Sequence, residues 1–200
     1  MTNFFHYSGT ELFVFEKATN WKRYYLDLCK SYFYNNSNIL EVGAGIGGLT
    51  KLFASYLPFK TWSIIEPDKD NFEILKDSLD IQFINKKLYY YNDQIKSFLD
   101  NNKQNYDIIF MADVLEHIEN DSEIISKLIN ILNDDGKLII FVPAHQFLFS
   151  EFDEKIGHFR RYSKNTLARL FPKDVFIQKM MYIDSFSKSF IIIYFNTFIV

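Results

Sequence analysis

The 200-residue chain has little cysteine, little net charge and no long apolar run, and each shortage excludes a class of protein. With Cys29 as its one cysteine, the chain can form neither an internal disulfide nor a cysteine-based metal site, which favours a reducing compartment. A net charge of −3 provides no basic footprint for nucleic acid. Because no uncharged apolar run reaches membrane-spanning length and no basic stretch precedes an apolar one at the N-terminus, we expect a cytoplasmic protein without a transmembrane segment.

Glycine is also scarce, with seven residues in the chain, but four of them lie between positions 43 and 48. They belong to the stretch Asn38-Ile-Leu-Glu-Val-Gly-Ala-Gly-Ile-Gly-Gly-Leu-Thr50, which predicts a buried strand, a glycine turn and the start of a helix. Glycine permits unusual backbone angles and lets a ligand approach the main chain closely, and the first N–H groups of the helix open beside the turn. We therefore expect a cofactor site here.

Two acids flank this turn. Glu41 lies two residues before the first glycine, where a carboxylate can face a cationic or amino-bearing ligand, and Glu66 ends the next apolar run. A carboxylate at position 66 can accept hydrogen bonds from both ribose hydroxyls of a nucleoside. The turn also satisfies the dinucleotide-binding pattern G-x-G-x-x-G, at Gly43, Gly45 and Gly48. Acids at two neighbouring strand ends nevertheless suit S-adenosylmethionine, whose sulfonium and ammonium are positive, better than a diphosphate.

With these residues in view, the chain resembles the class I S-adenosylmethionine-dependent methyltransferases, and more narrowly their type 11/12-like group. The resemblance covers roughly residues 36 to 185. It rests on four blocks in order: Leu40-Glu-Val-Gly-Ala-Gly-Ile-Gly47, Ile65-Glu-Pro-Asp68, Tyr106-Asp-Ile-Ile-Phe-Met-Ala-Asp-Val-Leu-Glu-His-Ile118 and Asp135-Gly-Lys-Leu-Ile-Ile-Phe-Val-Pro143. It implies a doubly wound α/β fold, in which a mostly parallel Rossmann-like sheet carries helices on both faces, with an N-terminal helical extension.

We expect a single methyltransferase domain over residues 1–200, with an N-terminal helical cap (1–35), a Rossmann-like core (36–185) and an apolar C-terminal segment (186–200). After the first strand, apolar runs predict further strands at 60–65, within 81–91, and at 106–111, 137–142 and 174–183. Capping residues and periodicity predict helices at 68–79, 94–99, 120–132 and 163–171. Residues 190–200 fit a seventh, antiparallel strand, a helix packed on the domain, or an exposed patch for a partner or membrane surface.

The carboxyl ends of parallel strands share one edge of a sheet, so the polar residues that follow the strands should gather there. The resemblance assigns the methyl donor to Glu41, Gly43, Ala44, Gly45, Glu66, Pro67, Asn92, Asp93, Met111, Ala112 and Asp113. Two of these assignments stay open. Asp93 either meets the adenine amino group or caps the helix at 94–99. Asp113 stands where many relatives have Asn, and either holds the donor or acts on the acceptor.

The acceptor is expected under the long connection at 143–162, since long loops in compact domains are usually lids or binding elements. Its candidate ligands are Tyr7, Trp21, His145, Arg160, Arg161 and Tyr162. His145, followed by His117 and His158, is the candidate general base, although each histidine could instead pin the loop. Arg160 and Arg161 could hold an anionic acceptor or pair with Asp153 and Glu154.

We expect no metal, because no two histidines share the helical spacing of ligands and there is no cysteine pair. The adjacent Glu116 and His117 are not expected to point at one atom, since neighbouring helical residues face about a hundred degrees apart.

The function expected from the sequence is methyl transfer from S-adenosylmethionine to a small-molecule acceptor. We expect O- or N-methylation by in-line displacement, which leaves S-adenosylhomocysteine. The alternatives are an NAD(P)-dependent oxidoreductase and a protein that binds S-adenosylmethionine without catalysis. No nucleic-acid partner is expected, a peripheral membrane or partner contact is open only through residues 190–200, and the sequence makes no prediction of oligomeric state.

Overall fold

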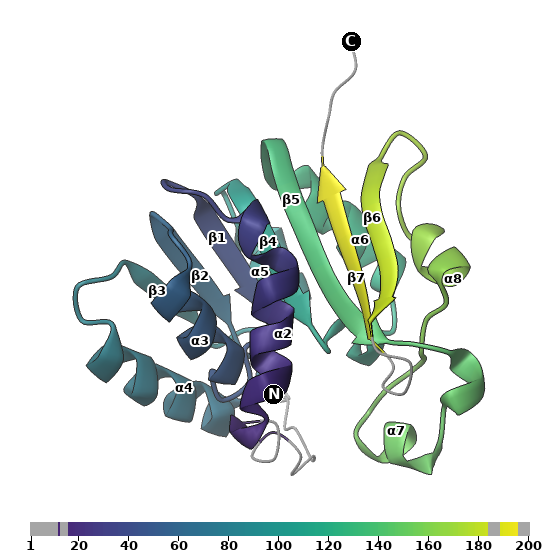
Figure 1. Ribbon diagram of the computed structural model, residues 1–200, viewed down its shortest axis with the longest axis horizontal. Coiled ribbons are helices and arrows are strands. Elements are labelled where there is room, and N and C mark those ends of the chain that lie inside the picture. Colours follow the sequence, from purple (N-terminus) through teal and green to yellow (C-terminus); the bar gives the residue numbers. More distant parts are fainter. Residues whose placement is uncertain (1–11, 13–15, 184–188, 196–200) are drawn as a thin grey trace. The chain divides into compact units, whose positions relative to one another are not determined.

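The computed structural model describes residues 12, 16–183 and 189–195, with 189–195 described by their backbone alone (Figure 1). The chain forms two compact units, Met1–Asn101 and Asn102–Val200. None of the helices in the described ranges is long and apolar enough to cross a membrane.

The first unit alternates helix and strand, as the sequence predicts. Its elements are α2 (Thr19–Cys29), η1 (Lys30–Tyr32), β1 (Asn38–Val42), α3 (Gly48–Tyr56), β2 (Thr61–Ile65), α4 (Lys69–Gln82), β3 (Leu88–Tyr91) and α5 (Ile95–Asn101). β2 pairs in parallel with β1 on one side and β3 on the other, and Ile65 is aligned with both Val42 and Tyr91. The three strands therefore end level, and the residues that follow them share one edge.

Apolar side chains on both faces of the strands hold this unit together. β1 and β2 are each buried from their second residue onward, as expected for parallel strands covered by helices. α2 packs against α3 and buries Tyr25 and Cys29 completely. The Trp21 ring lies 4.7 Å from the Tyr25 ring, so Trp21 packs on the buried side of its own helix. Tyr7 lies outside the described residues.

The second unit begins with two parallel strands and ends with two antiparallel ones. Its elements are β4 (Tyr106–Ala112), η2 (Leu115–His117), α6 (Asp121–Asn130), β5 (Leu132–Pro143), η3 (Gln146–Leu148), α7 (Glu151–Lys155), α8 (Lys164–Ala168), β6 (Phe176–Ile183) and β7 (Ser189–Phe195). β4 and β5 are parallel, whereas β7 lies between β5 and β6 and runs antiparallel to both. Of the three alternatives for the C-terminal segment, residues 189–195 therefore adopt the strand.

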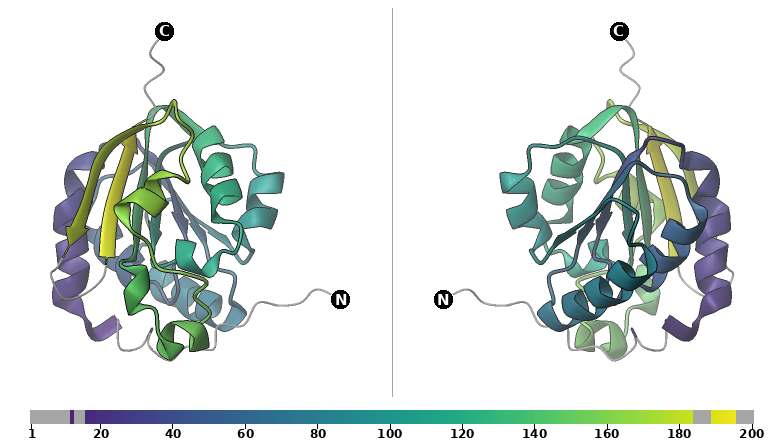
Figure 2. Two further views of the ribbon diagram at one scale, coloured as in Figure 1. Left: turned by 90° about the vertical axis from the view of Figure 1, so that its right-hand side faces the viewer. Right: turned by 90° about the vertical axis from the view of Figure 1, so that its left-hand side faces the viewer.

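The largest differences from the prediction in this unit concern β5, α8 and the connection after β5. β5 begins at Leu132 instead of residue 137, and residues 133–136 form an irregular part of the strand, with Asp135 at a φ of 60°. The helix expected at 163–171 ends at Ala168. The connection after β5 is not a plain loop, because it contains η3 and α7. This segment lies at the end of the unit toward which β5 points (Figures 1 and 2).

Candidate active site

The glycine turn after β1 lies against the end of β2. Gly43, Gly45 and Gly47 have φ angles of 72°, 56° and 86°, in the left-handed region that glycine adopts without strain. The backbone N–H groups of Gly43 and Ala44 donate to the carbonyl oxygen of Ile65, at 2.9 and 3.1 Å. The turn is thereby anchored to the last residue of β2.

The Glu66 carboxylate lies at this turn. One of its oxygens accepts a hydrogen bond from Gly45 N at 2.7 Å and the other from Asp68 N at 2.9 Å. Burial raises the pKa of Glu66 to about 7, although both hydrogen bonds act to lower it. A carboxylate has about four acceptor positions, so two remain for further donors such as ribose hydroxyls. The structure thus brings Glu66 to the glycines, and its role as a ribose ligand stays a prediction.

Glu41 faces inward, toward helix α3. It is 2% exposed, and one of its oxygens accepts a hydrogen bond from the Thr50 hydroxyl at 3.0 Å. Its second oxygen is buried and has no hydrogen-bond partner in the part of the chain that the structure describes. Burial raises the pKa of Glu41 to about 7. Glu41 therefore lies under the turn with one acceptor atom still available to a ligand's amino group.

The N-terminal segment reaches the same turn, through residues that sequence reasoning missed. A Cβ atom at Gly45 would lie 3.4 Å from the Leu12 side chain, and one at Gly48 would collide with the Glu16 carboxylate. Glu16 also pairs with Lys22 at 3.1 Å and with Lys51 at 3.6 Å. No spacing rule links an acid at position 16 to a turn more than thirty residues later, so only the folded chain identifies this contact.

The polar residues after β3 make contacts within the first unit. The Asn92 side-chain amide donates to the carbonyl oxygens of Glu66 at 2.9 Å and Pro67 at 3.2 Å, which ties the end of β3 to the end of β2. Asp93 accepts hydrogen bonds from Gln94 N and the Ser97 hydroxyl. These contacts lie at the start of α5, and both roles considered for Asp93 stay predictions.

Strained residues follow both parallel strands of the second unit. After Met111 and Ala112 end β4, Asp113 has a φ of 54°, and its N–H donates to Phe141 O on β5 at 3.0 Å. His145, two residues beyond β5, has a φ of 65°, and its ring stacks on Tyr182 at 4.6 Å. Left-handed non-glycine residues are uncommon and concentrate at functional sites. This edge of the β4–β5 pair is therefore a candidate reaction site.

The predicted acceptor ligands at 160–162 are bonded to other parts of the second unit. Arg161 forms a two-point pair with Asp153, whose carboxylate oxygens accept from Nε and Nη2 at 2.8 Å each. Arg160 pairs with Asp121 at 2.7 Å, and the buried Tyr162 hydroxyl donates to the same carboxylate at 3.0 Å. Arg161 therefore makes the ion pair with Asp153 that was the alternative to binding an anionic acceptor. Roles of these three residues toward an acceptor stay predictions.

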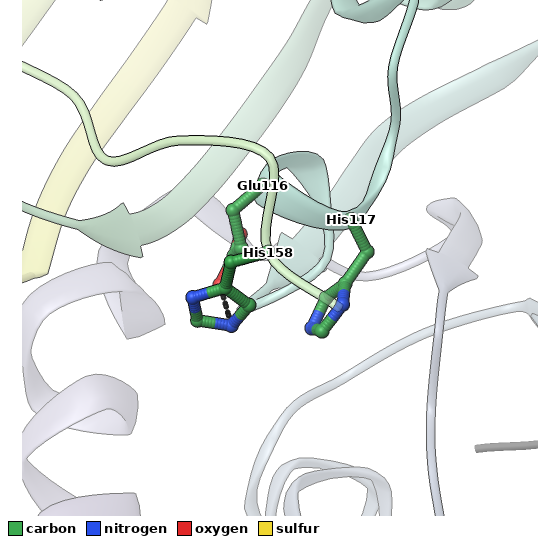
Figure 3. A group of neighbouring side chains, drawn as sticks. All are labelled: Glu116, His117 and His158. Carbon is green, nitrogen blue, oxygen red and sulfur yellow. Dashed lines mark ion pairs between the residues drawn. The ribbon is translucent and has the colours of Figure 1, made fainter. Parts of the chain in front are cut away.

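Glu116, His117 and His158 meet at the end of β4 (Figure 3). The Glu116 Oε1 and His158 Nε2 atoms lie 3.8 Å apart, and the two imidazole rings lie 4.5 Å apart at 81°. The sequence argument that Glu116 and His117 diverge assumed a regular helix, whereas η2 is a single 3-10 turn from which both side chains reach one region. His158 arrives from the loop after α7, so no ligand spacing could have predicted the group.

Comparison with known proteins identifies the class. A family model described as a methyltransferase domain matches residues 16–174. The fold is similar to that of the N-methyltransferase NodS from Bradyrhizobium japonicum WM9 in complex with S-adenosyl-L-homocysteine, with a TM-score of 0.68, 16% identity and coverage of 89% of this chain and 86% of that one. It is also similar to an O-methyltransferase family protein from Burkholderia thailandensis, with a TM-score of 0.75, 12% identity and coverage of 92% and 58%.

A third similar structure is magnesium protoporphyrin IX methyltransferase from Synechocystis PCC 6803 with bound S-adenosylmethionine, with a TM-score of 0.63, 13% identity and coverage of 91% and 79%. No curated protein matches the sequence.

The chain belongs to this family of methyltransferase domains, because the family model spans most of its length. It is an enzyme of the class I S-adenosylmethionine-dependent methyltransferases, with their Rossmann-like fold. The resemblance inferred from the four sequence blocks is therefore confirmed, and the family decides against the oxidoreductase alternative.

Proposed function

We propose that this enzyme transfers a methyl group from S-adenosylmethionine to a hydroxyl or amino group of a small molecule. The observation that carries the donor assignment is the Glu66 carboxylate held 2.7 Å from Gly45 N, which joins an acid at the end of β2 to the glycine turn. A nucleoside at this turn could place its ribose hydroxyls against the carboxylate.

The residues of the first unit fit the donor. Glu66 would accept from the ribose hydroxyls through its two remaining acceptor positions, and the main chain at Gly43–Gly45 would lie along the donor. The second oxygen of Glu41, buried without a hydrogen-bond partner in the described residues, would accept from the donor's amino group. S-adenosylmethionine supplies, when bound, a methyl group on a positively charged sulfur.

The charge of the loop above the second unit supports a small, uncharged acceptor. Arg160 and Arg161 are each neutralised by a carboxylate of the protein, from Asp121 and Asp153, and so offer no free cationic pair to a phosphate chain. A nucleic-acid acceptor would need such a basic surface. The N-methyltransferase and O-methyltransferase with similar folds agree with an amine or a hydroxyl as the acceptor.

His145 is our candidate for the general base, because it follows β5 directly and is held in a strained backbone conformation. It would take the proton of the acceptor as the new bond to carbon forms. A base of this kind contributes typically about 10²- to 10⁴-fold in rate. Orientation of the acceptor in line with the breaking bond, with water excluded, contributes more, since effective molarities on the order of 10⁵ M or higher are reached by positioning alone.

Isothermal titration calorimetry of the full chain against S-adenosylmethionine, S-adenosylhomocysteine and NAD tests the donor site. We expect one molecule of either sulfur compound per chain and no NAD. Glu66→Ala should weaken the donor at least about 10-fold, because even one hydrogen bond to a charged group contributes roughly 1.5–3 kcal/mol. Glu73→Ala, which removes an exposed acid on α4, is the matched control. Unchanged affinity in Glu66→Ala would refute the ribose assignment.

A screen of hydroxyl and amine acceptors with methyl-labelled donor then tests catalysis. With any acceptor found, His145→Gln should lower kcat about 100-fold while leaving donor affinity unchanged. Donor binding without turnover on any acceptor would instead support the non-catalytic alternative.

A further inference from the structure

The cluster of Glu116, His117 and His158 lies within the second unit and combines three groups that bind metals. One ligand atom from each residue can be chosen so that all three lie within 4.8 Å of one another. Figure 3 shows the carboxylate of Glu116 beside the ring of His158, with the His117 ring to the right of both. Two imidazoles and a carboxylate are a donor set typical of zinc and of divalent iron.

Glu116 is an unsatisfied acid in the interior. Glu116 is 0% exposed, and both of its carboxylate oxygens are buried without a hydrogen-bond partner in the described parts of the chain. Burial raises the pKa of Glu116 well above its usual value, and repulsion from Asp113 and Asp153 adds to this, while Arg161 opposes it. A buried carboxylate without partners is costly, and in native proteins it usually coordinates a metal or pairs with a cation.

His158 is oriented as a ligand. Its Nδ1 lies 2.9 Å from Asp153 Oδ1, and that carboxylate is itself fixed by Arg161. The paired Asp153 is an anion, since hydrogen bonds from Arg161 and Ser150 outweigh burial and hold its pKa far below the usual range. It therefore accepts from Nδ1–H, which leaves the lone pair of Nε2 facing Glu116. A carboxylate that orients a histidine in this way is the usual outer partner of a metal-binding imidazole.

The separation of these two residues leaves room for a metal ion that would bind both. A carboxylate oxygen and an imidazole lone pair face each other at 3.8 Å, which is too long for a hydrogen bond through a shared proton. Donor atoms bound to one tetrahedral Zn²⁺ at bond lengths of about 2.1 Å lie about 3.4 Å apart, so a small inward movement would complete both bonds.

His117 completes the group as a neutral imidazole. Burial lowers the pKa of His117 to about 4, with a further contribution from His158, and a hydrogen bond to the backbone of Gly157 offsets this only in part. Gly157 has a φ of 84°, and a Cβ there would lie 3.7 Å from His117 Nδ1, so the loop passes close to this ring.

We propose that Glu116, His117 and His158 bind one divalent first-row transition-metal ion, with Zn²⁺ as the representative. A pinning role for the histidines explains the bond from His158 to Asp153, but it leaves the Glu116 carboxylate without a hydrogen-bond partner in the described residues, whereas a metal ion would bind that carboxylate. Three protein ligands leave at least one coordination position open. A hydroxyl acceptor bound at that position would lose its proton more readily, and this consequence, unlike metal binding itself, rests on the proposed function.

The test is metal uptake by the full-length chain after removal of metals with a chelator. Zn²⁺ is titrated in competition with a chromophoric chelator, without donor or acceptor, and Mn²⁺, Mg²⁺ and Ca²⁺ are titrated in parallel by calorimetry. We expect one Zn²⁺ per chain and weaker binding of Mg²⁺ and Ca²⁺, which prefer oxygen ligands. Glu116→Gln and His117→Gln should each weaken Zn²⁺ more than about 100-fold, since even outer partners contribute roughly 10- to 100-fold.

His145→Gln is the matched control, because it removes a histidine of the same unit outside the cluster, and its Zn²⁺ affinity should equal that of the wild type. Thermal unfolding separates ligation from a structural role. Glu116→Gln removes a buried acid whose ionisation the interior disfavours, so its metal-free form should unfold at the same or a higher temperature than the wild type, yet gain no stability from Zn²⁺.

Failure of the wild type to take up Zn²⁺, equal uptake by Glu116→Gln, or a preference for Mg²⁺ would overturn the proposal. Glu66→Ala should retain full Zn²⁺ uptake, so loss of donor binding and loss of metal binding are distinguished.

Discussion

Tyr162 shows how one buried side chain joins distant segments of the second unit. The residue is 1% exposed, and its hydroxyl donates to Asp121 and lies 3.2 Å from the Leu115 carbonyl oxygen. Tyr162→Phe would remove the donor but keep the ring, leaving Asp121 with one partner fewer. We expect a loss of about 1–2 kcal/mol in the free energy of unfolding, measured by urea denaturation.

Tyr56→Phe is the control for this change, because Tyr56 is 67% exposed and its hydroxyl can be replaced by water. Its free energy of unfolding should stay within about 0.5 kcal/mol of the wild type. Equal effects of the two substitutions would show that the hydroxyl of Tyr162 contributes nothing to the closure of the loop.

Whether the contacts of a single residue could be predicted depended on how far along the chain its partners lie. Glu66 could be found because an acid at the end of a strand, one strand after a glycine turn, is a local pattern. The direction of the Glu41 carboxylate toward α3 could not be predicted. The alternation of side chains along a strand gives the face of the sheet on which Glu41 lies, but not the residue that it contacts. The approach of His158 to Glu116 could not be predicted either, because it depends on a loop that returns to Glu116 about forty residues later in the chain.

Among the elements, the start of α3 depends on Gly47. It has a φ of 86°, and a Cβ at this position would lie 2.6 Å from Leu75 Cδ1, a buried atom of α4. Gly47→Ala therefore combines left-handed strain with overpacking, and we expect a loss of about 2 kcal/mol in the free energy of unfolding. Chemical denaturation monitored by tryptophan fluorescence measures it.

Gly47→Asn separates the two causes. Asparagine tolerates the left-handed region better than alanine but carries the same Cβ, so it should destabilise less if strain dominates. An effect at least as large as that of alanine would assign the loss to the collision with Leu75.

Strands with continuous apolar sequences could be predicted. Boundaries that depend on pairing with a neighbouring strand could not. β1, β2 and β4 follow from continuous buried residues, whose hydrophobicity exceeds any competing local preference. The early start of β5 depends on Leu132 pairing with Tyr106 across an irregular ladder, which no local signal encodes. α7 is only five residues long, and its capping box of Ser150 and Asp153 is recognisable mainly once the helix is known.

For the whole molecule, the inward-facing Glu41 makes stability depend on pH. Burial, with a smaller contribution from repulsion by Glu66, raises its pKa from the ordinary 4.5 to about 7, against the hydrogen bond from Thr50. Between pH 4.5 and 7 the folded chain therefore retains a proton that the unfolded chain has lost. Raising the pH across this range favours unfolding, by an amount that approaches about 3 kcal/mol from this group.

Glu41→Gln removes this titration while its side-chain oxygen can still accept from Thr50. The free energy of unfolding of the variant, minus that of the wild type, should rise by up to about 3 kcal/mol between pH 4.5 and 8, because all other titrations nearly cancel in the difference. Relief of the repulsion on Glu66 acts in the same direction. Urea denaturation at intervals across this range measures the difference, with Glu73→Gln on α4 as the exposed control. If the difference in the free energy of unfolding does not change with pH, Glu41 is already ionised in the folded enzyme. If the difference falls as the pH rises, the interior stabilises the charge of Glu41.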